Sequence, residues 1–348
     1  MSTRCTDLDA GDLAACRELL ASGSRTFYAA SYLLPAGVRD AATALYAFCR
    51  LADDAVDGGA DAAAAHAALS ERLERAYAGR ALPADRAFAA VVHGYGIPIA
   101  LPQALLEGFR WDAEARRYQT LDDLTAYATR VAGTVGAMMA LLMGAREPAV
   151  LARACDLGIA MQFSNIARDV GEDARAGRLY LPLEWLAEAG IGAAAFLAAP
   201  RHTPALGSVV GRLLAVADQL YERAGTGIGE LPLACRPGMQ AARLLYAAIG
   251  AEVRRRGLDA VTGRAHVGAA RKAELLARAV VAGLTPAVAD ASPTLPAARF
   301  VVDAAVAGTN ASPARLRLSD RVIWMLELFE RLEQREAAAR ASRGVLAS

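Results

Sequence analysis

A row of polar side chains on an otherwise apolar helix is the feature that most restricts how this chain folds. Gln162–Asp173 reads QFSNIARDVGED, and polar residues recur at every fourth position as Asn165, Asp169 and Asp173. Residues four apart in a helix lie on nearly the same face, about 6 Å apart along the axis. The apolar neighbours of the row are Ile159, Met161, Phe163, Ile166 and Val170. The pattern therefore predicts a largely enclosed helix that carries two carboxylates.

Enclosed carboxylates repel each other unless arginines or cations compensate their charge. Taken alone, the row favours a helix face that neighbouring arginines neutralise. A second acidic row, at Asp53, Asp54 and Asp57, favours another interpretation. Two carboxylate pairs on separate helices suit a cluster of Mg²⁺ ions, which prefer hard oxygen ligands and bridge carboxylates to substrate phosphates. Asn165 fits beside these acids as a neutral oxygen ligand.

Composition and periodicity predict an all-α fold. Alanine is abundant, 55% of the residues are hydrophobic and 22% are charged. Abundant alanine favours helices, and the strict alternation of apolar and polar residues that indicates strands is essentially absent. We expect long helices over 121–142, with Thr120 as the N-cap, and over 148–170, followed by a loop over 171–182.

Charge and the scattered reactive residues exclude several classes of protein. The net charge of +1 does not indicate a nucleic-acid binder. Five dispersed cysteines without a CxxC pair and four histidines without an HExxH pattern predict neither a disulfide framework nor a zinc site. The longest apolar run, Val131–Ala145, is too short and too rich in glycine to span a bilayer. We expect a cytoplasmic protein, with peripheral contact at the inner face of the cytoplasmic membrane as a further expectation.

Three motifs resemble the squalene/phytoene synthase family, and most closely its bacterial phytoene-forming members. They are YAFCRLADDAVD (Tyr46–Asp57), YATRVAGTVG (Tyr127–Gly136) and QFSNIARDVGEDARAGRLYLP (Gln162–Pro182), and the resemblance runs from about Ser24 to Leu276. It implies a single-domain, isoprenoid-synthase-type helical bundle with a central cavity. It also implies Mg²⁺-dependent (or Mn²⁺-dependent) head-to-head condensation of two geranylgeranyl diphosphates, by way of prephytoene diphosphate, to phytoene in carotenoid biosynthesis.

The resemblance also implies roles for individual residues. Asp53 and Asp57 would hold metal from one side of the cavity, and Asn165, Asp169 and Asp173 from the other. The small residues after Tyr127 would make room for prenyl tails, and the Tyr127 hydroxyl would orient a cation or diphosphate. The same small residues also fit close helix packing. The predicted substrate-binding residues are Ser24, Arg25, Phe27, Tyr46, Arg50, Gln162, Arg168, Tyr246, Arg264 and Lys272, the last of which is the only lysine and equally fits an ordinary surface position.

The domain prediction has three segments. Residues 1–282 form the all-α catalytic domain, and 283–313 form an Ala/Pro-rich loop or tether. Residues 314–348 form an amphipathic helix that packs on the same domain or a partner subunit, with a membrane-surface position as the alternative.

Other members of the family leave two alternatives open. A dehydrosqualene or squalene synthase would use farnesyl diphosphate, and squalene synthesis would add NADPH, whereas phytoene formation implies no NADPH. A non-catalytic assembly factor related to the family would be expected to lose acidic ligands, yet all five predicted metal ligands are present. Expected partners are the prenyl diphosphate, the membrane surface and downstream carotenoid enzymes, and no nucleic acid.

Overall fold

The computed structural model describes residues 8–23, 28, 30–57, 62–285 and 292–308, apart from the side chains of residues 56, 57 and 62. The chain divides into two units, residues 1–313 and 314–348. The second unit, which contains the predicted C-terminal helix, lies outside the described residues. The helices and side chains described belong to the first unit.

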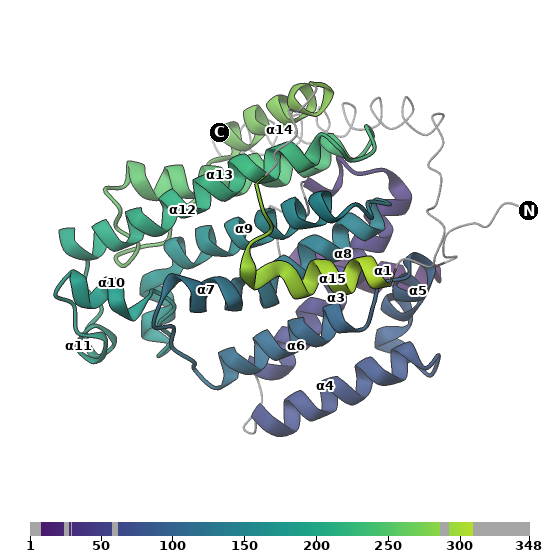
Figure 1. Ribbon diagram of the computed structural model, residues 1–348, viewed down its shortest axis with the longest axis horizontal. Helices are drawn as coiled ribbons and strands as arrows, with labels where there is room; N and C mark the ends of the chain where they lie inside the picture. Colours follow the sequence, from purple (N-terminus) through teal and green to yellow (C-terminus); the bar gives the residue numbers. More distant parts are fainter. Residues whose placement is uncertain (1–7, 24–27, 29, 58–61, 286–291, 309–348) are drawn as a thin grey trace, which may run out of the picture. The chain divides into compact units, whose positions relative to one another are not determined.

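The described part of the chain is built from helices and contains no strand, which confirms the predicted all-α class (Figure 1). The elements are α1 (Ala10–Gly23), α3 (Ala36–Asp57), α4 (Ala62–Tyr77), η1 (Pro83–Asp85), α5 (Arg86–Tyr95), α6 (Ala100–Ala113), α7 (Leu121–Ala128), η2 (Thr129–Gly133), α8 (Thr134–Leu142), α9 (Pro148–Arg175), α10 (Leu183–Glu188), α11 (Ala193–Ala198), α12 (Pro204–Ile228), α13 (Arg236–Arg255), α14 (Ala269–Leu284), η3 (Pro296–Ala298) and α15 (Arg299–Ala307).

Helix α9, which carries the polar row, lies at the centre of this unit. It packs against α8, α12 and α13, and Figure 1 shows α13 and α14 on one side of it and α6 and α4 on the other. Pro148 occupies its first turn, where the missing amide hydrogen costs nothing. Because neighbours cover α9 on several sides, Asn165, Asp169 and Asp173 are partly buried.

The end of α9 differs from the prediction in a way that matters for the site. The sequence predicted a helix end at Val170 and a loop from Gly171. Instead the helix continues to Arg175, and Gly171 is a packing residue. A Cβ atom there would lie 2.5 Å from the carbonyl oxygen of Val261, too close for any side chain. The extra turn keeps Asp173 on the same helix as the rest of the row.

The predicted helix 121–142 is interrupted by a π-helical turn. Thr120 caps its start as expected, in a reciprocal capping box with Asp123. The turn η2 then separates α7 from α8, and a single inserted residue of this kind leaves no periodic signal in the sequence. The close packing predicted for the small residues here is confirmed, because a Cβ on Gly136 would lie 2.1 Å from the carbonyl oxygen of Ala154 on α9.

The predicted loop or tether over 283–313 contains helix α15, so this part of the domain prediction was wrong. Val301, Val302 and Ala305 are buried on one face of α15, which packs against α6, α8 and α9. The Ala- and Pro-rich surroundings masked this short apolar stripe. Just before η3, Arg153 donates to the carbonyl of Ser292 at 3.1 Å and so fastens the segment to α9.

Candidate active site

A cavity of about 160 Å³ lies between α8, α9 and α13 and has two chemically different ends. Its lining residues are Ala30, Ser31, Leu34, Val131, Ala132, Val135, Gly136, Met139, Leu157, Gly158, Met161, Gln162, Asn165, Gly238, Met239, Ala242 and Tyr246. Along α9, the lining begins with Leu157 and ends with Gln162 and Asn165. The acidic residues Asp169 and Asp173 follow one and two turns later. Helix α9 therefore runs from an apolar well to a polar end, which we call the polar cap.

Two predicted arginines converge on Asp169 in the polar cap. The Nε atom of Arg168 lies 2.6 Å from Oδ1 of Asp169, and the Nε atom of Arg264 lies 2.8 Å from the same oxygen. Arg264 also pairs with Glu172 at 3.5 Å. The arginine-neutralised helix face considered from the sequence is thus present. A guanidinium group has five N–H donors, so these pairs leave donors for phosphate oxygens.

The charge on Asp173 is poorly compensated by its surroundings. Burial, together with the negative charge of Asp169, raises the pKa of this carboxyl group to about 7, against a smaller lowering effect of Arg178. A nearby divalent cation would favour the ionised form. Together with Asn165, these side chains supply the hard oxygen donors that suit Mg²⁺, so the residues present fit the predicted metal.

Carboxylates in the described part of the chain do not by themselves form a closed metal site. No group of three Asp, Glu, His or Cys side chains among the described residues lies in a position to hold an ion. Mg²⁺ commonly takes only one or two carboxylates and completes its coordination with water and substrate phosphates. The donor set therefore suits a metal that arrives together with a diphosphate.

The first acidic row lies near the C-terminal end of α3. Arg50 pairs with Asp54 at 2.6 Å and with Asp53 at 3.7 Å. Burial raises the pKa of Tyr46, the charge of Arg50 opposes this increase, and Tyr246 on α13 adds to it. Asp57 is the last residue of α3, and its side chain lies outside the described residues.

Asp112 on α6 interacts electrostatically with a member of each acidic row, Asp53 and Asp173, and was given no role from the sequence. Its carboxylate accepts hydrogen bonds from the hydroxyl groups of Tyr127 at 2.8 Å and Tyr180 at 2.7 Å. Burial raises its pKa to about 6, and the charge of Asp53 contributes to the increase. Asp112 in turn raises the pKa of Asp173. The fields of both acidic rows therefore overlap at Asp112.

Tyr127 is 2% exposed, and its hydroxyl group donates a hydrogen bond to the carboxylate of Asp112. Burial, with the charge of Asp112, raises the pKa of Tyr127 well above its ordinary value, so this hydroxyl keeps its proton at neutral pH. Its ring lies 5.3 Å from that of Tyr180. Arg178 and Tyr180 belong to the third sequence motif, so the motif match itself could have marked them as candidates.

The remaining predicted substrate-binding residues either lie outside the described residues or make no described contact with the polar cap. Ser24, Arg25 and Phe27 lie outside the described residues. Lys272 is half-buried in the first turn of α14, and the described contacts do not join it to the polar cap.

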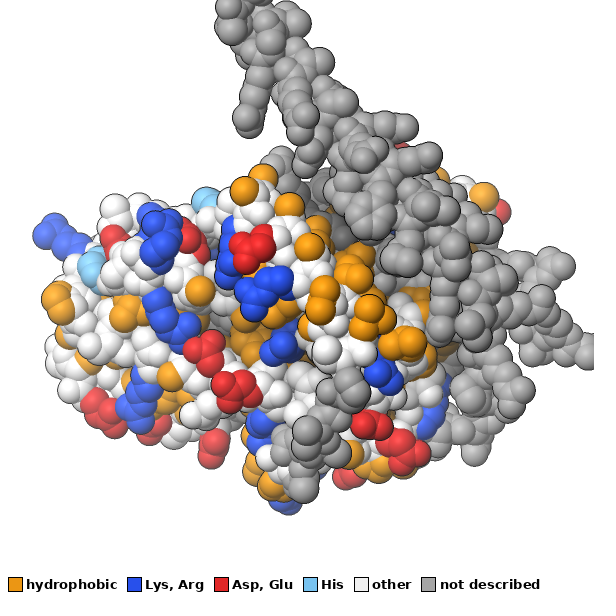
Figure 2. Space-filling view, turned by 90° about the horizontal axis from the view of Figure 1, so that it is seen from above, with side chains coloured by type: hydrophobic (Ala, Val, Ile, Leu, Met, Phe, Trp, Pro, Cys, Tyr) orange, Lys and Arg blue, Asp and Glu red, His pale blue; other side chains and the backbone are white. Residues whose placement is uncertain are grey.

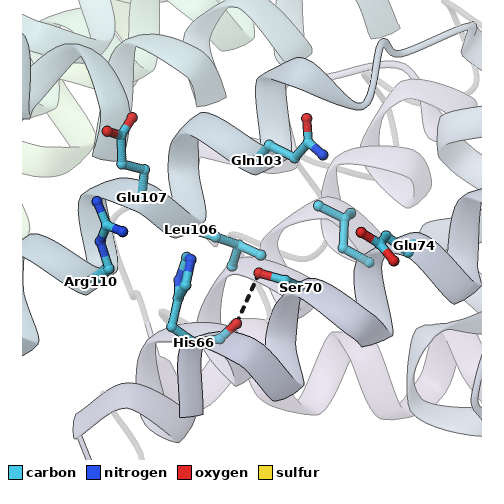
Figure 3. A pocket seen from close by; sticks show the side chains of 8 residues that line it. His66, Ser70, Glu74, Gln103, Leu106, Glu107 and Arg110 are labelled. Atoms are coloured by element: carbon cyan, nitrogen blue, oxygen red, sulfur yellow. Dashed lines mark hydrogen bonds between the residues drawn. The ribbon is translucent and has the colours of Figure 1, made fainter. Parts of the chain in front are cut away.

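A larger hollow of about 340 Å³ lies between α4 and α6, away from the predicted residues (Figure 3). It is lined mostly by polar side chains, including His66, Glu74 and Arg110. The hydroxyl group of Ser70 donates to the carbonyl of His66 in its own helix, and Glu107 pairs with Arg130 at 2.7 Å. Such a lining does not suit a hydrocarbon tail, so we place the candidate active site at the smaller, apolar cavity.

Replacing Asp112 with asparagine is expected to change how stability depends on pH. The folded pKa of about 6 exceeds the ordinary value of 3.8, so the ionised carboxylate destabilises the folded state. This cost is absent below a pH of about 4 and grows as the pH rises to about 6. The unfolding free energy of the wild type minus that of Asp112→Asn should fall by roughly 2–3 kcal/mol across this interval. Urea unfolding of both proteins between pH 4 and 7.5 measures it, and a pH-independent difference would contradict it.

Comparison with known proteins identifies the family. Residues 20–271 match the profile of the squalene/phytoene synthase family. The chain is 53% identical over 330 residues to the phytoene synthase of Rhodobacter capsulatus, covering 92% of this chain and 97% of that protein. It is 49% identical over 337 residues to the phytoene synthase of Cereibacter sphaeroides, covering 92% and 94%. A solved structure of a dehydrosqualene synthase in complex with a ligand matches with a TM-score of 0.69 and 30% identity, over 77% of this chain and 95% of that chain. The chain therefore belongs to the squalene/phytoene synthase family.

Proposed function

We propose that the protein is a prenyltransferase that condenses two molecules of geranylgeranyl diphosphate head to head and converts the product to phytoene. The observation that carries this proposal is the course of α9, from the apolar well at Leu157 to the acidic and basic groups at Asp169. An allylic diphosphate has the same two halves, an apolar tail and a strongly charged head. The named relatives in Rhodobacter capsulatus and Cereibacter sphaeroides are phytoene synthases.

The chemistry requires the leaving diphosphate to be neutralised while water is kept from the carbocation. Guanidinium groups bind phosphate oxygens in bidentate geometry, and Arg50, Arg168 and Arg264 are the candidates for that contact. The well excludes water because apolar side chains such as Val135 and Met139 line it. The double bond of the second substrate then attacks the cation, and loss of a proton closes the cyclopropane ring of prephytoene diphosphate. A second ionisation, rearrangement and loss of one proton give phytoene.

Mg²⁺ (or Mn²⁺) is the cofactor that the residues fit. Asp53 and Asp57 on α3 and Asn165, Asp169 and Asp173 on α9 would hold it. When bound, the metal neutralises negative charge on the diphosphate. No hydride enters the product in this sequence of steps, so we propose that NADPH is not required. Because the Tyr127 hydroxyl stays protonated, the released diphosphate is the better candidate for the final base.

Product analysis separates this function from its alternatives. Purified protein would be incubated with Mg²⁺ and either geranylgeranyl or farnesyl diphosphate, with and without NADPH, and the hydrocarbon identified. We expect phytoene from geranylgeranyl diphosphate regardless of NADPH. Squalene formed only with NADPH would establish the farnesyl diphosphate alternative, and dehydrosqualene as the main product would establish its reductant-free form. No hydrocarbon from either substrate would favour a non-catalytic assembly factor.

We propose in addition that the protein contacts a membrane surface through α14. Within the part of the chain that the structure describes, no helix is long and apolar enough to cross a bilayer. Val281 and Leu284 on α14 are 65% and 64% exposed, and Leu233 is 42% exposed. Figure 2 shows hydrophobic side chains gathered on the side of α13 and α14, with both basic and acidic side chains around them. Exposed apolar groups beside cations favour binding to anionic lipid. Contact with downstream carotenoid enzymes and a cytoplasmic location remain predictions from the sequence.

Sedimentation with lipid vesicles tests the membrane contact. The double variant Val281→Glu, Leu284→Glu should lose most of its binding to vesicles that contain phosphatidylglycerol, because two charges replace the apolar contact. Turnover of detergent-solubilised substrate should be unchanged. Phe300→Glu on α15, where the phenylalanine is 41% exposed, is the matched control and should still bind. Equal loss of binding in both variants would contradict a specific contact through α14.

A further inference from the structure

A second, smaller cavity lies directly behind the apolar well. It measures about 20 Å³, and we call it the inner cavity. Its lining residues are Ala140, Met143, Val150, Arg153, Ala154, Leu157, Ala224, Gly227, Ile228, Leu231 and Met239. Leu157 on α9 and Met239 on α13 line both the well and the inner cavity. These two side chains form the wall that separates the two spaces.

The well is too small for a prenyl tail unless side chains around it move. A protein cavity of about 150 Å³ holds a guest the size of benzene, and the well measures about 160 Å³. A tail of fifteen or twenty carbons needs several times that room. The diphosphate is expected at the polar cap, so the far end of the tail points along α9 toward Leu157 and Met239.

We propose that Leu157 and Met239 determine how long a prenyl tail the protein accepts, because their side chains, with the inner cavity behind them, occupy the space into which a longer tail would extend. This proposal rests on the proposed function and adds the residues that select substrate length. Geranylgeranyl and farnesyl tails differ by one five-carbon unit at the end farthest from the diphosphate. In this proposal, the last unit of the longer tail lies against the wall between the cavities.

The wall between the two cavities can move more easily than the floor of the inner cavity, which is formed by Arg153 and Gly227. Methionine is unbranched and adapts its shape easily, and Met239 is half-buried between the two hydrophobic clusters of the protein. The floor of the inner cavity is fixed, because a Cβ on Gly227 would lie 2.3 Å from Cβ of Arg153, and Arg153 pairs with Asp156 at 2.9 Å. A longer tail therefore takes the space that Met239 or Leu157 vacates, together with the inner cavity, and stops at Arg153.

Substitutions of Met239 should move substrate preference in opposite directions. Met239→Trp fills this space, so the ratio of kcat/KM for the twenty-carbon to the fifteen-carbon diphosphate should fall about tenfold or more, the usual effect of a small misfit in an apolar pocket. Met239→Ala opens it and should raise relative use of a twenty-five-carbon diphosphate by a similar factor. Leu157→Phe should act like Met239→Trp, and gives a second result if the tryptophan variant does not fold.

Met138→Ala is the matched control, because Met138 is fully buried and lines neither cavity. It makes the same deletion and should leave the substrate ratios unchanged. Binding of unreactive prenyl thiodiphosphates with fifteen, twenty and twenty-five carbons, measured by calorimetry, follows tail length without turnover. Unchanged length preference in the folded Met239 and Leu157 variants, in both assays, would overturn the proposal. Failure of the wild type to form hydrocarbon, with length-dependent binding retained, would instead overturn the proposed reaction.

Discussion

Asp169→Asn is expected to reduce turnover by about 10²–10³-fold while leaving the helical circular dichroism spectrum unchanged. The magnitude is that of removing one preorganised electrostatic group from an active site. Asparagine has almost the same shape as aspartate, so α9 should keep its structure. The lost charge is the one on which Arg168 and Arg264 converge, at 2.6 Å and 2.8 Å. It is also one of the proposed metal ligands, so half-maximal activity should require more Mg²⁺.

Glu172→Gln provides the matched control for this prediction. Glu172 lies on the same helix and pairs with the same Arg264, at 3.5 Å, but its side chain is 55% exposed. Glu172 does not belong to the row formed by Asn165, Asp169 and Asp173. Product formation at saturating substrate should therefore change less than about threefold, within the small effect of an exposed ion pair. If Asp169→Asn retained activity like that of Glu172→Gln, Asp169 would not belong to the catalytic site.

The polar row shows what local sequence could predict. Four-residue spacing among apolar neighbours identified Asn165 and Asp169 as members of one enclosed helix face, since this depends only on helix geometry. The same local reasoning ended the helix at Val170, because the residues from Gly171 onward lose the helical pattern. A glycine is needed at this position because a Cβ atom would lie 2.5 Å from the carbonyl oxygen of Val261. Val261 is ninety residues farther along the chain, so the local sequence carries no signal of this contact.

The setting of Tyr127 shows what the sequence could not supply. The motif indicated a buried hydroxyl group that acts on a cation or diphosphate. The structure places that hydroxyl on Asp112, which also accepts a hydrogen bond from Tyr180. These three residues come from α6, α7 and the loop before α10, and only the packing of these segments brings them together. A polar contact between distant segments has no periodic pattern, so it had to be read from the structure.

Asp156→Asn is expected to destabilise the protein by about 3 kcal/mol or more. Asp156 is fully buried and pairs at 2.9 Å with Arg153 and at 2.9 Å with Arg223. Removing one partner of a buried ion pair leaves an uncompensated charge, which typically costs about 3–5 kcal/mol. Arg153 is only 4% exposed, so its charge cannot turn to water.

The consequence should extend beyond α9, because the same arginines hold the segment that leads to α15. Arg153 donates to the carbonyl of Ser292 at 3.1 Å, and Arg223 donates to that of Pro293 at 2.9 Å. When Asp156 no longer orients the two guanidinium groups, both contacts should weaken. Limited proteolysis under native conditions should then cut Asp156→Asn near residues 292–298 faster than it cuts the wild type.

Asp218→Asn separates this buried effect from the general cost of losing an ion pair. Asp218 on α12 pairs with Arg254 at 2.5 Å, but its side chain is 47% exposed. Exposed pairs contribute about 1 kcal/mol or less, so urea unfolding should show a small change for Asp218→Asn and a several-fold larger one for Asp156→Asn. Similar losses in the two variants would mean that water reaches Asp156. Arg153 would then be held less firmly, and the floor of the inner cavity would move to admit a longer tail. Leu157 and Met239 would in that case not be sufficient to limit tail length.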